Sequence, residues 1–354
     1  MNLDDFLSRS RKRLACFLTE FLDAKKSETA GVNAWGRDIT DRLKAYTVLG
    51  KMIRGALVLL GCRAAGSRIT QDAVRAGAAM ELVQSALLIH DDIMDNDTLR
   101  RGEPSFHRRY AALGRRENIA EADHFGLSMG LCGGDIAIFL AFEVLAGMRS
   151  ANRKTPAAVR LFARELTLVG LGQMQDLYAG ATSKHIGEKD ILGLYLHKTA
   201  RYSFSLPLAM GCLIGGGSPA LRRGLEQCGE YLGLIFQLRD DDLGMFGSEE
   251  EIGKPVGSDI REGKKTLHRH LLMERAPAAE RRKLEKIFGR ADASEADIRA
   301  VRDRVEALGV REEVGRRIEV LRRKAKTGIH RLPAAERYRT LLHELLTYSI
   351  ARKK

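Results

Sequence analysis

Three aspartates close an apolar segment in the stretch Leu87-Leu88-Ile89-His90-Asp91-Asp92-Ile93-Met94-Asp95. Upstream, from Gln71 onward, apolar residues recur three and four positions apart, which is the spacing of a buried helix face. Residues i, i+1 and i+4 share one side of a helix, so the three carboxylates are expected to converge. Their repulsion at the negative end of the helix dipole is costly unless a cation lies there, and Mg²⁺ prefers such oxygen ligands.

Helical spacing extends along the whole chain, and no sustained strand pattern interrupts it. An all-α fold is therefore expected. Residues 100–125 are polar and basic and are expected to form a long irregular stretch. Since no repeat or linker composition marks a boundary, one domain over residues 1–354 is expected. The expected helices span about 3–22, 57–65, 71–95, 128–148, 157–179, 189–214, 219–246 and much of 264–352.

The net charge of +13 does not by itself indicate a nucleic-acid binder. Residues 311–354 contain 13 basic and 5 acidic side chains and so supply +8 of the excess. The sequence has neither a Cys/His finger nor an aromatic-rich strand for base stacking. We expect this region to be a solvated helix face, with weak attraction to an anionic membrane surface as the lesser alternative.

Five scattered cysteines, an odd number without a C-x-x-C pair, argue against a disulfide framework and against a zinc–cysteine site. Reduced thiols are the expected state. The first twenty residues include Asp4 and Asp5 and no apolar run long enough for a signal peptide or a membrane span. A cytoplasmic protein without a transmembrane segment is expected.

A second acidic cluster ends another apolar helix at residues 240–242. Asp240 and Asp241 can repeat the geometry of the first pair, whereas Asp242 points to nearly the opposite side and cannot replace a carboxylate at Gly244. Either cluster alone is about as well explained by a solvated helix end. Metal-binding acids beside anion-binding bases, however, indicate a diphosphate site. Such bases follow both clusters: Arg100 and Arg101 after the first, and Lys254, Lys264 and Lys265 after the second.

In these motifs the chain resembles the trans-prenyl diphosphate synthase (polyprenyl synthetase) family, and within it the geranylgeranyl diphosphate synthases. The resemblance covers nearly the whole chain in order. It departs at Leu49 and Met52, where the family often has Gly and Arg, and at Gly244, where the second metal position lacks a carboxylate. The matching motifs are Gly50-Lys51-Met52-Ile53-Arg54, residues 90–95, Arg100-Arg101-Gly102-Glu103-Pro104 with His107, Gly172-Gln173-Met174-Gln175-Asp176, Lys198-Thr199, Phe236-Gln237 with Asp240-Asp241, Gly253-Lys254 and Gly263-Lys264-Lys265-Thr266.

The resemblance implies an isoprenoid-synthase fold, which is a single large helical bundle with a central active-site cavity. It also implies a homodimeric, Mg²⁺-dependent prenyltransferase with about three ions per site. Such an enzyme ionises an allylic diphosphate and joins it head to tail (1'-4) to isopentenyl diphosphate. No side chain need act as base, because the released diphosphate can accept the proton.

The resemblance also assigns roles to individual residues. Ionisation is assigned to Asp91, Asp92, Asp95, Arg100, Lys198 and Asp240, and metal binding to Asp91, Asp92, Asp95, Asp240 and Asp241. The allylic diphosphate is assigned to Arg100, Lys198, Thr199, Gln237, Lys254 and Lys264, and isopentenyl diphosphate to Lys51, Arg54, His90 and Arg101.

Product length is expected to depend on the helix face that precedes Asp91. One turn before it, about 5.4 Å away, lie Ala86 and Leu87, and two turns before it lie Leu82 and Val83. A bulky aromatic residue near Ala86 would close a tunnel there. Because Ala86 is small and Leu87 only medium in size, we expect a product of 20 carbons or more, with geranylgeranyl diphosphate first.

Two other functions remain open from the sequence. A class I terpene cyclase also ionises a prenyl diphosphate with an aspartate-rich helix, but it needs no second diphosphate site. Lys51, Arg54 and the Arg100-Arg101 pair therefore favour condensation. A non-catalytic partner subunit of a synthase is the other alternative; Gly244 keeps it open, while the intact first cluster counts against it.

Overall fold

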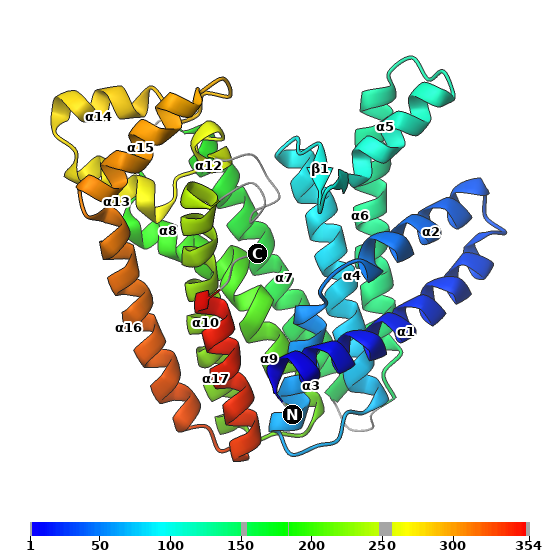
Figure 1. The fold of residues 1–354 in the computed structure, drawn as a ribbon. Helices are drawn as coiled ribbons and strands as arrows, with labels where there is room; N and C mark the ends of the chain where they lie inside the picture. Colours follow the sequence, from blue (N-terminus) through cyan, green and yellow to red (C-terminus); the bar gives the residue numbers. More distant parts are fainter. Residues whose placement is uncertain (1, 150–153, 183, 248–256, 352–354) are drawn as a thin grey trace. The chain divides into compact units, whose positions relative to one another are not determined.

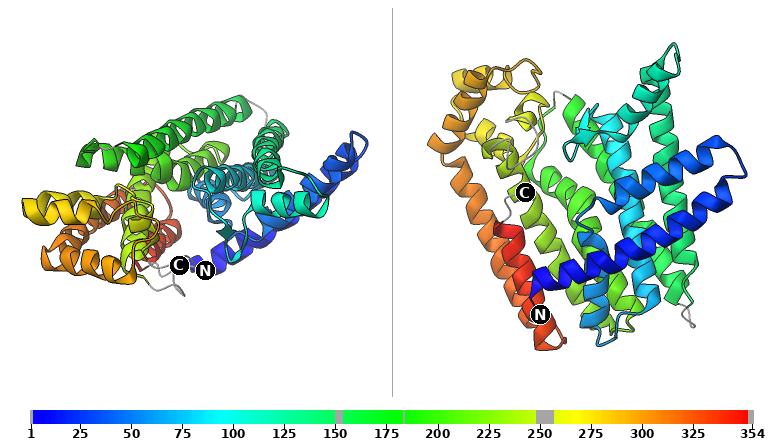
Figure 2. Two further views of the ribbon diagram at one scale, coloured as in Figure 1. Left: turned by 90° about the horizontal axis from the view of Figure 1, so that it is seen from above. Right: turned by 45° about the vertical axis from the view of Figure 1, so that its right-hand side comes forward.

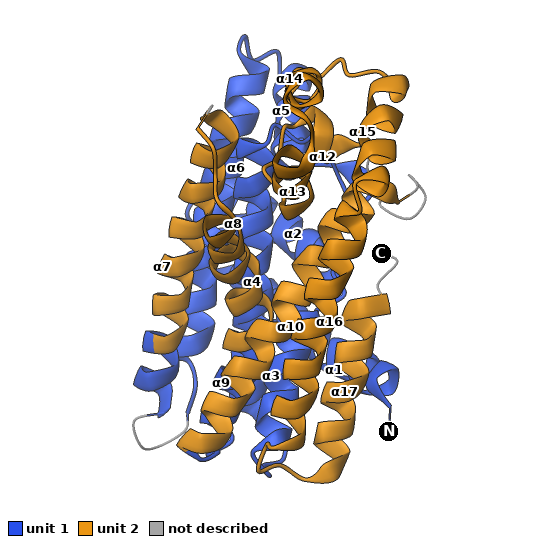
Figure 3. Cartoon of the chain, turned by 90° about the vertical axis from the view of Figure 1, so that its left-hand side faces the viewer, with its two compact units in different colours: residues 1–160, 207–218 blue, residues 161–206, 219–354 orange. Residues whose placement is uncertain are grey.

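The structure, a computed structural model, describes residues 2–149, 154–182, 184–247 and 257–351. It is all-α apart from two very short strands among these residues, as the sequence predicts. The chain forms two compact units, which Figure 3 shows in different colours. Unit 1 comprises Met1–Arg160 and Pro207–Ser218, and unit 2 comprises Leu161–Leu206 and Pro219–Lys354. The single domain and the central cavity stay predictions.

Unit 1 is organised around helix α4, which packs against α3 and α6, while α1 lies beside α2 and α5 beside α6 (Figures 1 and 2). Strands β1 and β2 pair antiparallel, with Arg100 opposite Glu103. The elements are α1 (Leu3–Thr29), α2 (Ala34–Val48), α3 (Ile53–Ala64), α4 (Gln71–Met94), β1 (Leu99–Arg100), β2 (Glu103–Pro104), α5 (Phe106–Arg116), α6 (Ala122–Ala146) and most of α9 (Leu206–Ile214).

Helix α4 is held in place by a cap and by small residues. The side chain of Thr70 accepts a hydrogen bond from the backbone of Ala73 and starts the helix. A Cβ on Gly77 would lie 3.0 Å from the carbonyl oxygen of Gly55, so only glycine allows α3 and α4 to approach this closely. The helix ends at Met94 with Asp95 as its C-cap, so the aspartates lie at a helix C-terminus as predicted.

Unit 2 is organised around helix α10, which packs against η1, α16 and α17. Residues 219–246 form one helix with the predicted bounds. The elements are most of α7 (Lys154–Ala181), then α8 (Glu188–Leu194), η1 (Tyr195–Ser205), α10 (Pro219–Phe246), α12 (Ser258–Arg261), α13 (Leu267–Arg275), α14 (Ala278–Glu285), α15 (Glu295–Ala307), α16 (Val310–His330) and α17 (Glu336–Ala351).

The segment predicted as a regular helix over residues 189–214 contains a π-helix, η1. A π-helix has a wider turn than an α-helix and occurs mostly at functional sites. Glycines on α10 let it approach: a Cβ on Gly233 would overlap the backbone of Ala200, and one on Gly229 would overlap that of Ser205. The backbone therefore carries Lys198 and Thr199 on an irregular turn packed tightly against α10.

The prediction of an irregular stretch over residues 100–125 is wrong. Most of it is regular, because it contains the rest of the β1–β2 hairpin, all of α5 and the start of α6. Helix α5 buries Phe106 and Tyr110, one turn apart, and Ala111 beside them, on one face. Its dense arginines on the other face made the segment look like a loop in the sequence. Helix α2 was not predicted either.

The basic C-terminal region behaves as a paired, solvated surface over much of its described length. Arg316 and Glu313 on α16 lie 2.6 Å apart, and Arg322 and Glu319 on the same helix lie 2.6 Å apart. These partners are three residues apart, which places them on one helix face. The arrangement favours the solvated helix face that the sequence predicts.

Candidate active site

The first acidic cluster divides into one buried and two more accessible carboxylates. Asp92 is fully buried, and its Oδ1 accepts a hydrogen bond of 2.6 Å from Nε of Arg100. Burial raises the pKa of Asp92 to about 6, although Arg100 opposes this shift. Asp91 is half-buried with an oxygen 3.9 Å from Arg100, and Asp95 is exposed at the helix end. The cluster thus combines an inner carboxylate that holds Arg100 with outer carboxylates that can reach a cation.

Asp97 also belongs to this cluster, and sequence reasoning missed it. Its carboxylate accepts a hydrogen bond of 2.9 Å from Arg100, and its backbone N–H donates to the carbonyl of Asp92. Ser105 donates to the Asp97 carbonyl at 2.8 Å and so fixes the turn. Asp97 lies beyond the end of α4, where helical spacing no longer predicts direction. The D-x-D pattern of Asp95 and Asp97 was the available signal.

The two early basic motifs lie close together in unit 1. Arg101 donates to the carbonyl of Tyr46 at 3.2 Å, and a Cβ on Gly50 would lie 3.4 Å from its guanidinium. Buried Glu81 accepts a hydrogen bond of 2.7 Å from the backbone of Gly55. Burial raises the pKa of Glu81, while that hydrogen bond and the charges of Arg54 and Arg101 lower it. Glu81 therefore lies within reach of the charges of Arg54 and Arg101, while Lys51 is exposed.

His90 faces helix α6. Its Nε2 lies 3.3 Å from the carbonyl oxygen of Leu131 and 3.6 Å from a carboxylate oxygen of Asp135. A Cβ on Gly134 would overlap the His90 ring, so glycine is needed for this contact. Its role in binding isopentenyl diphosphate stays a prediction. Gln84 is a second polar candidate, because it lies seven residues, or about two turns, before Asp91 and so shares its helix face.

The predicted chain-length residues lie on the largely buried α4. Leu82, Val83 and Ala86 have no exposed surface, and Leu87 is partly exposed. A larger side chain at Ala86 must therefore displace whatever packs there. That these residues line a product tunnel stays a prediction.

In unit 2, a chain of hydrogen bonds joins η1 to the second acidic cluster. Thr199 Oγ1 donates to Oε1 of Gln237 at 2.9 Å, and Nε2 of Gln237 donates to Asp241 at 2.8 Å. The hydroxyl of Tyr195 also donates to Asp241. Burial, together with the charge of Asp259, raises the pKa of Asp241 to about 8. Asp241 is thus the inner carboxylate of this cluster, while Asp240 is exposed at the surface of α10.

Asp242 lies away from this network, as predicted. Its carboxylate is 3.0 Å from the guanidinium of Arg311 and 3.0 Å from that of Arg239. Although burial opposes the shift, the neighbouring His268 and the hydrogen bonds from Arg311 lower the pKa of Asp242 to about 2. Asp242 therefore stabilises the packing of α10 against α16 and is not available as a ligand.

Asp259, which sequence reasoning also missed, fills the space beside Gly244. A Cβ on Gly244 would overlap an Asp259 carboxylate oxygen and lie 3.1 Å from its Cγ. Burial raises the pKa of Asp259, while Lys264, 3.4 Å away, lowers it. The Asp259 carboxylate on α12 therefore lies beside Gly244, the position at which the second cluster lacks a carboxylate. Helical spacing could not find it, because it lies fifteen residues downstream of Gly244.

The remaining predicted cations of unit 2 have different surroundings. Lys198 pairs with Asp176 at 2.5 Å, and a Cβ on Gly172 would lie 2.9 Å from the Lys198 backbone nitrogen, so two predicted motifs do meet. Lys264 is partly exposed beside Asp259. Lys254 lies outside the described residues.

Comparisons with known proteins identify the family. The family model for polyprenyl synthetase matches residues 37–305. A short chain isoprenyl diphosphate synthase from Methanothermobacter thermautotrophicus is 35% identical over 247 residues, 70% of each chain. A geranylgeranyl diphosphate synthase from Sulfolobus acidocaldarius is 32% identical over 73% of each chain. The crystal structure of geranylgeranyl pyrophosphate synthase from Corynebacterium glutamicum, complexed with isoprenyl diphosphate and magnesium, is 32% identical and has a TM-score of 0.91, covering 99% of this chain and 100% of that one.

Proposed function

The chain belongs to the polyprenyl synthetase family, and we propose that it condenses isopentenyl diphosphate with allylic diphosphates to make geranylgeranyl diphosphate. The family and the prenyltransferase activity follow from the match over residues 37–305 and from relatives 32–35% identical. The 20-carbon product is our proposal, supported by the names of those relatives and by the small Ala86 on α4.

One observation carries the proposal, namely the network around Arg100. This guanidinium is held by Asp92 and Asp97 beside the more accessible Asp91. A cation fixed next to outward carboxylates suits a diphosphate that is bound through metal on one side and through hydrogen bonds on the other. Arg101, which lies by Gly50, supports a second anion site for the other substrate.

The chain's residues account for binding and charge stabilisation. We assign the allylic diphosphate to Arg100, Lys198 and Lys264, with Thr199 oriented by Gln237. When its C–O bond breaks, these groups stabilise the leaving diphosphate. The double bond of isopentenyl diphosphate then forms the new C–C bond, and a proton is lost to the released diphosphate. Isopentenyl diphosphate is assigned to Lys51, Arg54, Arg101 and His90.

Magnesium fits the chemistry of both clusters. Asp91 and Asp95 offer accessible oxygen ligands in unit 1; in unit 2 the exposed Asp240 offers one, and the largely buried Asp259 can offer another. Bound Mg²⁺ would neutralise the diphosphate as it leaves. We propose that Asp92 and Asp241 position these ligands from within, since both are buried and hydrogen-bonded. We further propose that about three ions take part.

Product analysis tests this function. Purified protein is incubated with isopentenyl diphosphate, Mg²⁺ and each allylic primer, and the products are sized by mass spectrometry. All-trans geranylgeranyl diphosphate is expected. A cyclic hydrocarbon would identify a terpene cyclase, and no elongation from any primer would identify a non-catalytic partner subunit. Asp91→Asn is expected to abolish elongation, whereas Asp303→Asn, an exposed aspartate on α15, serves as the matched control.

We also propose a homodimer that uses the outer face of α6. Phe139 is 69% exposed and Leu131 is 49% exposed on this helix. Among the described residues, α6 is also the one single helix long and apolar enough to cross a membrane, with a mean hydropathy of 1.8 over its most apolar window. Light scattering is expected to give a dimer for the wild type and a monomer for Phe139→Glu. A wild-type protein that needs detergent to stay in solution would favour the membrane instead.

A cytoplasmic location remains a proposal that rests on the cysteines. Cys62, Cys212 and Cys228 are buried, Cys16 and Cys132 are exposed, and all five are free thiols. Free thiols are typical of reducing compartments. Fractionation of the native cells, with and without high salt, tests this proposal together with the weak membrane-surface contact.

A further inference from the structure

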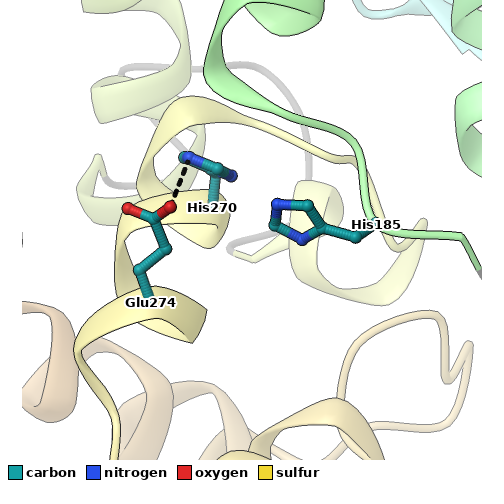
Figure 4. A group of neighbouring side chains, drawn as sticks. All are labelled: His185, His270 and Glu274. Carbon is teal, nitrogen blue, oxygen red and sulfur yellow. Dashed lines mark ion pairs between the residues drawn. The ribbon is translucent and has the colours of Figure 1, made fainter.

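Two histidines and a glutamate lie together in unit 2, outside both aspartate clusters (Figure 4). His270 and Glu274 are one turn apart on α13, and His185 lies in the connection between α7 and α8. One ligand atom from each residue can be chosen so that all lie within 4.8 Å of one another. Nε2 of His270 is 3.3 Å from a Glu274 oxygen, and the two imidazole rings are 5.2 Å apart.

The central histidine is poorly satisfied by the protein alone. His270 is 7% exposed, and its Nδ1 is buried without a hydrogen-bond partner among the described residues. A buried polar nitrogen without a partner is uncommon in folded proteins and calls for an explanation. His185 and Glu274 are exposed, so both side chains can move toward His270, which is buried on α13.

The donor set suits a particular class of ion. Imidazole nitrogen with one carboxylate favours Zn²⁺ and similar transition metals, whereas Mg²⁺ takes oxygen ligands. Zinc bonds of about 2.0–2.1 Å place tetrahedral ligands roughly 3.4 Å apart. From the present spacing of at most 4.8 Å, the exposed His185 and Glu274 side chains need to close by up to roughly 1.4 Å, which a rotamer change supplies. Water can complete the coordination.

We propose that His185, His270 and Glu274 form a binding site for a zinc-like divalent ion that fixes the α7–α8 connection to α13. Lys265 already joins these parts, because its Nζ donates to the carbonyls of Thr182 and Lys184. The connection follows the α7 segment that carries Asp176 and precedes η1, which carries Lys198. An ion here stabilises the scaffold between these two segments, and its binding does not depend on the proposed function.

Zinc binding to the full chain tests this site. Protein stripped with a chelator is titrated with ZnCl₂ by calorimetry in excess Mg²⁺, so that the aspartate clusters are occupied by magnesium. We expect one zinc ion per chain, at least tenfold weaker binding for His185→Gln and for Glu274→Gln, and no change for the control His343→Gln. His185 and Glu274 are exposed, so both variants are expected to fold like the wild type.

Two further readouts separate this site from adventitious binding. Zinc is expected to raise the melting temperature of the wild type and of His343→Gln but not that of His185→Gln. Cobalt, used in place of zinc, is expected to give visible absorption typical of four or five ligands, and this absorption is lost in His185→Gln. Unchanged zinc affinity in both cluster variants, or no binding by the wild type below millimolar zinc, would overturn the proposal.

Discussion

Gly244→Asp restores the carboxylate that the second acidic cluster lacks, yet we expect it to harm the protein. A Cβ at this position would lie 3.1 Å from Cγ of Asp259, whereas carbon atoms pack best at about 3.5–4.0 Å. Asp259 must therefore move by roughly 0.5–1 Å in a buried environment. Overpacking of this kind costs about 1–3 kcal/mol. Two carboxylates about 4 Å apart add repulsion of about 4 kcal/mol at an effective dielectric of about 20, before any cation or protonation relieves it.

The expected result is a loss of up to about 5–7 kcal/mol in the free energy of unfolding without metal, the sum of the two effects, and a smaller loss with Mg²⁺ and pyrophosphate. For a chain of this size each kcal/mol lowers the melting temperature by about 2–4 °C. Thermal unfolding followed by circular dichroism, with and without these ligands, measures both values. Gly244→Ala introduces the steric overlap without the charge and so separates the two causes.

The double variant Gly244→Asp/Asp259→Gly provides the decisive comparison. It moves one carboxylate from α12 to α10 and keeps their number constant. If Asp259 occupies the place of the missing ligand, the double variant should be more stable than Gly244→Asp and should bind Mg²⁺ more tightly than Asp259→Gly, which we expect to lose about 10- to 100-fold in affinity. A Gly244→Asp variant with wild-type melting temperature and tighter Mg²⁺ binding would refute the reasoning.

Three other predictions follow from the structure. Ala86→Phe is expected to shorten the product to about fifteen carbons with activity retained, as product sizing will show; unchanged length in an active variant counts against a tunnel along α4. Gly134→Ala should displace the His90 ring and raise KM for isopentenyl diphosphate about tenfold, with little change in KM for the primer. If KM for isopentenyl diphosphate stays at the wild-type value, His90 does not bind that substrate. Although burial opposes the shift, Arg201 lowers the pKa of Glu165 below its ordinary 4.5, so the pair stabilises the fold above about pH 4.5 and less as the pH falls. Acid titration of stability should therefore be flatter for Glu165→Gln, and an identical slope would show that the pair does not contribute.

The parts of the site that the sequence predicted are those set by local geometry. Asp91, Asp92 and Asp95 end an apolar helix, so their position follows from helical spacing alone, and the divergence of Asp242 from Asp240 follows from the same rule. The family resemblance assigned Arg101 and the residues after Gly50 to the same substrate, but it did not predict their contact. Helix α5 was missed because its arginines obscured a narrow buried face.

The parts that the sequence did not predict depend on contacts between segments that are distant in the sequence. Asp259 reaches Gly244 through a later segment, and no spacing rule connects positions fifteen residues apart across a break in the helix. The π-helix that carries Lys198 forms where η1 packs against glycines of α10, so its cause is tertiary. The His185–His270 pairing likewise joins a connection to a helix 85 residues downstream.

Both acidic pairs divide their work in the same way, and helical geometry explains why. Adjacent residues on a helix point about 100° apart, so when one carboxylate of a pair faces solvent its neighbour can point toward the protein. Asp92 and Asp241 are the inward members, and each is held by hydrogen bonds, from Arg100 in one case and from Tyr195 and Gln237 in the other. Burial raises the pKa of Asp92 to about 6 and that of Asp241 to about 8, and these hydrogen bonds oppose the shifts. The outward members, Asp91 and Asp240, keep access to a cation. Each adjacent pair therefore supplies one metal ligand and one inward carboxylate whose hydrogen bonds hold that turn of the helix in place. Replacing the inward carboxylate should weaken metal binding without removing a metal ligand.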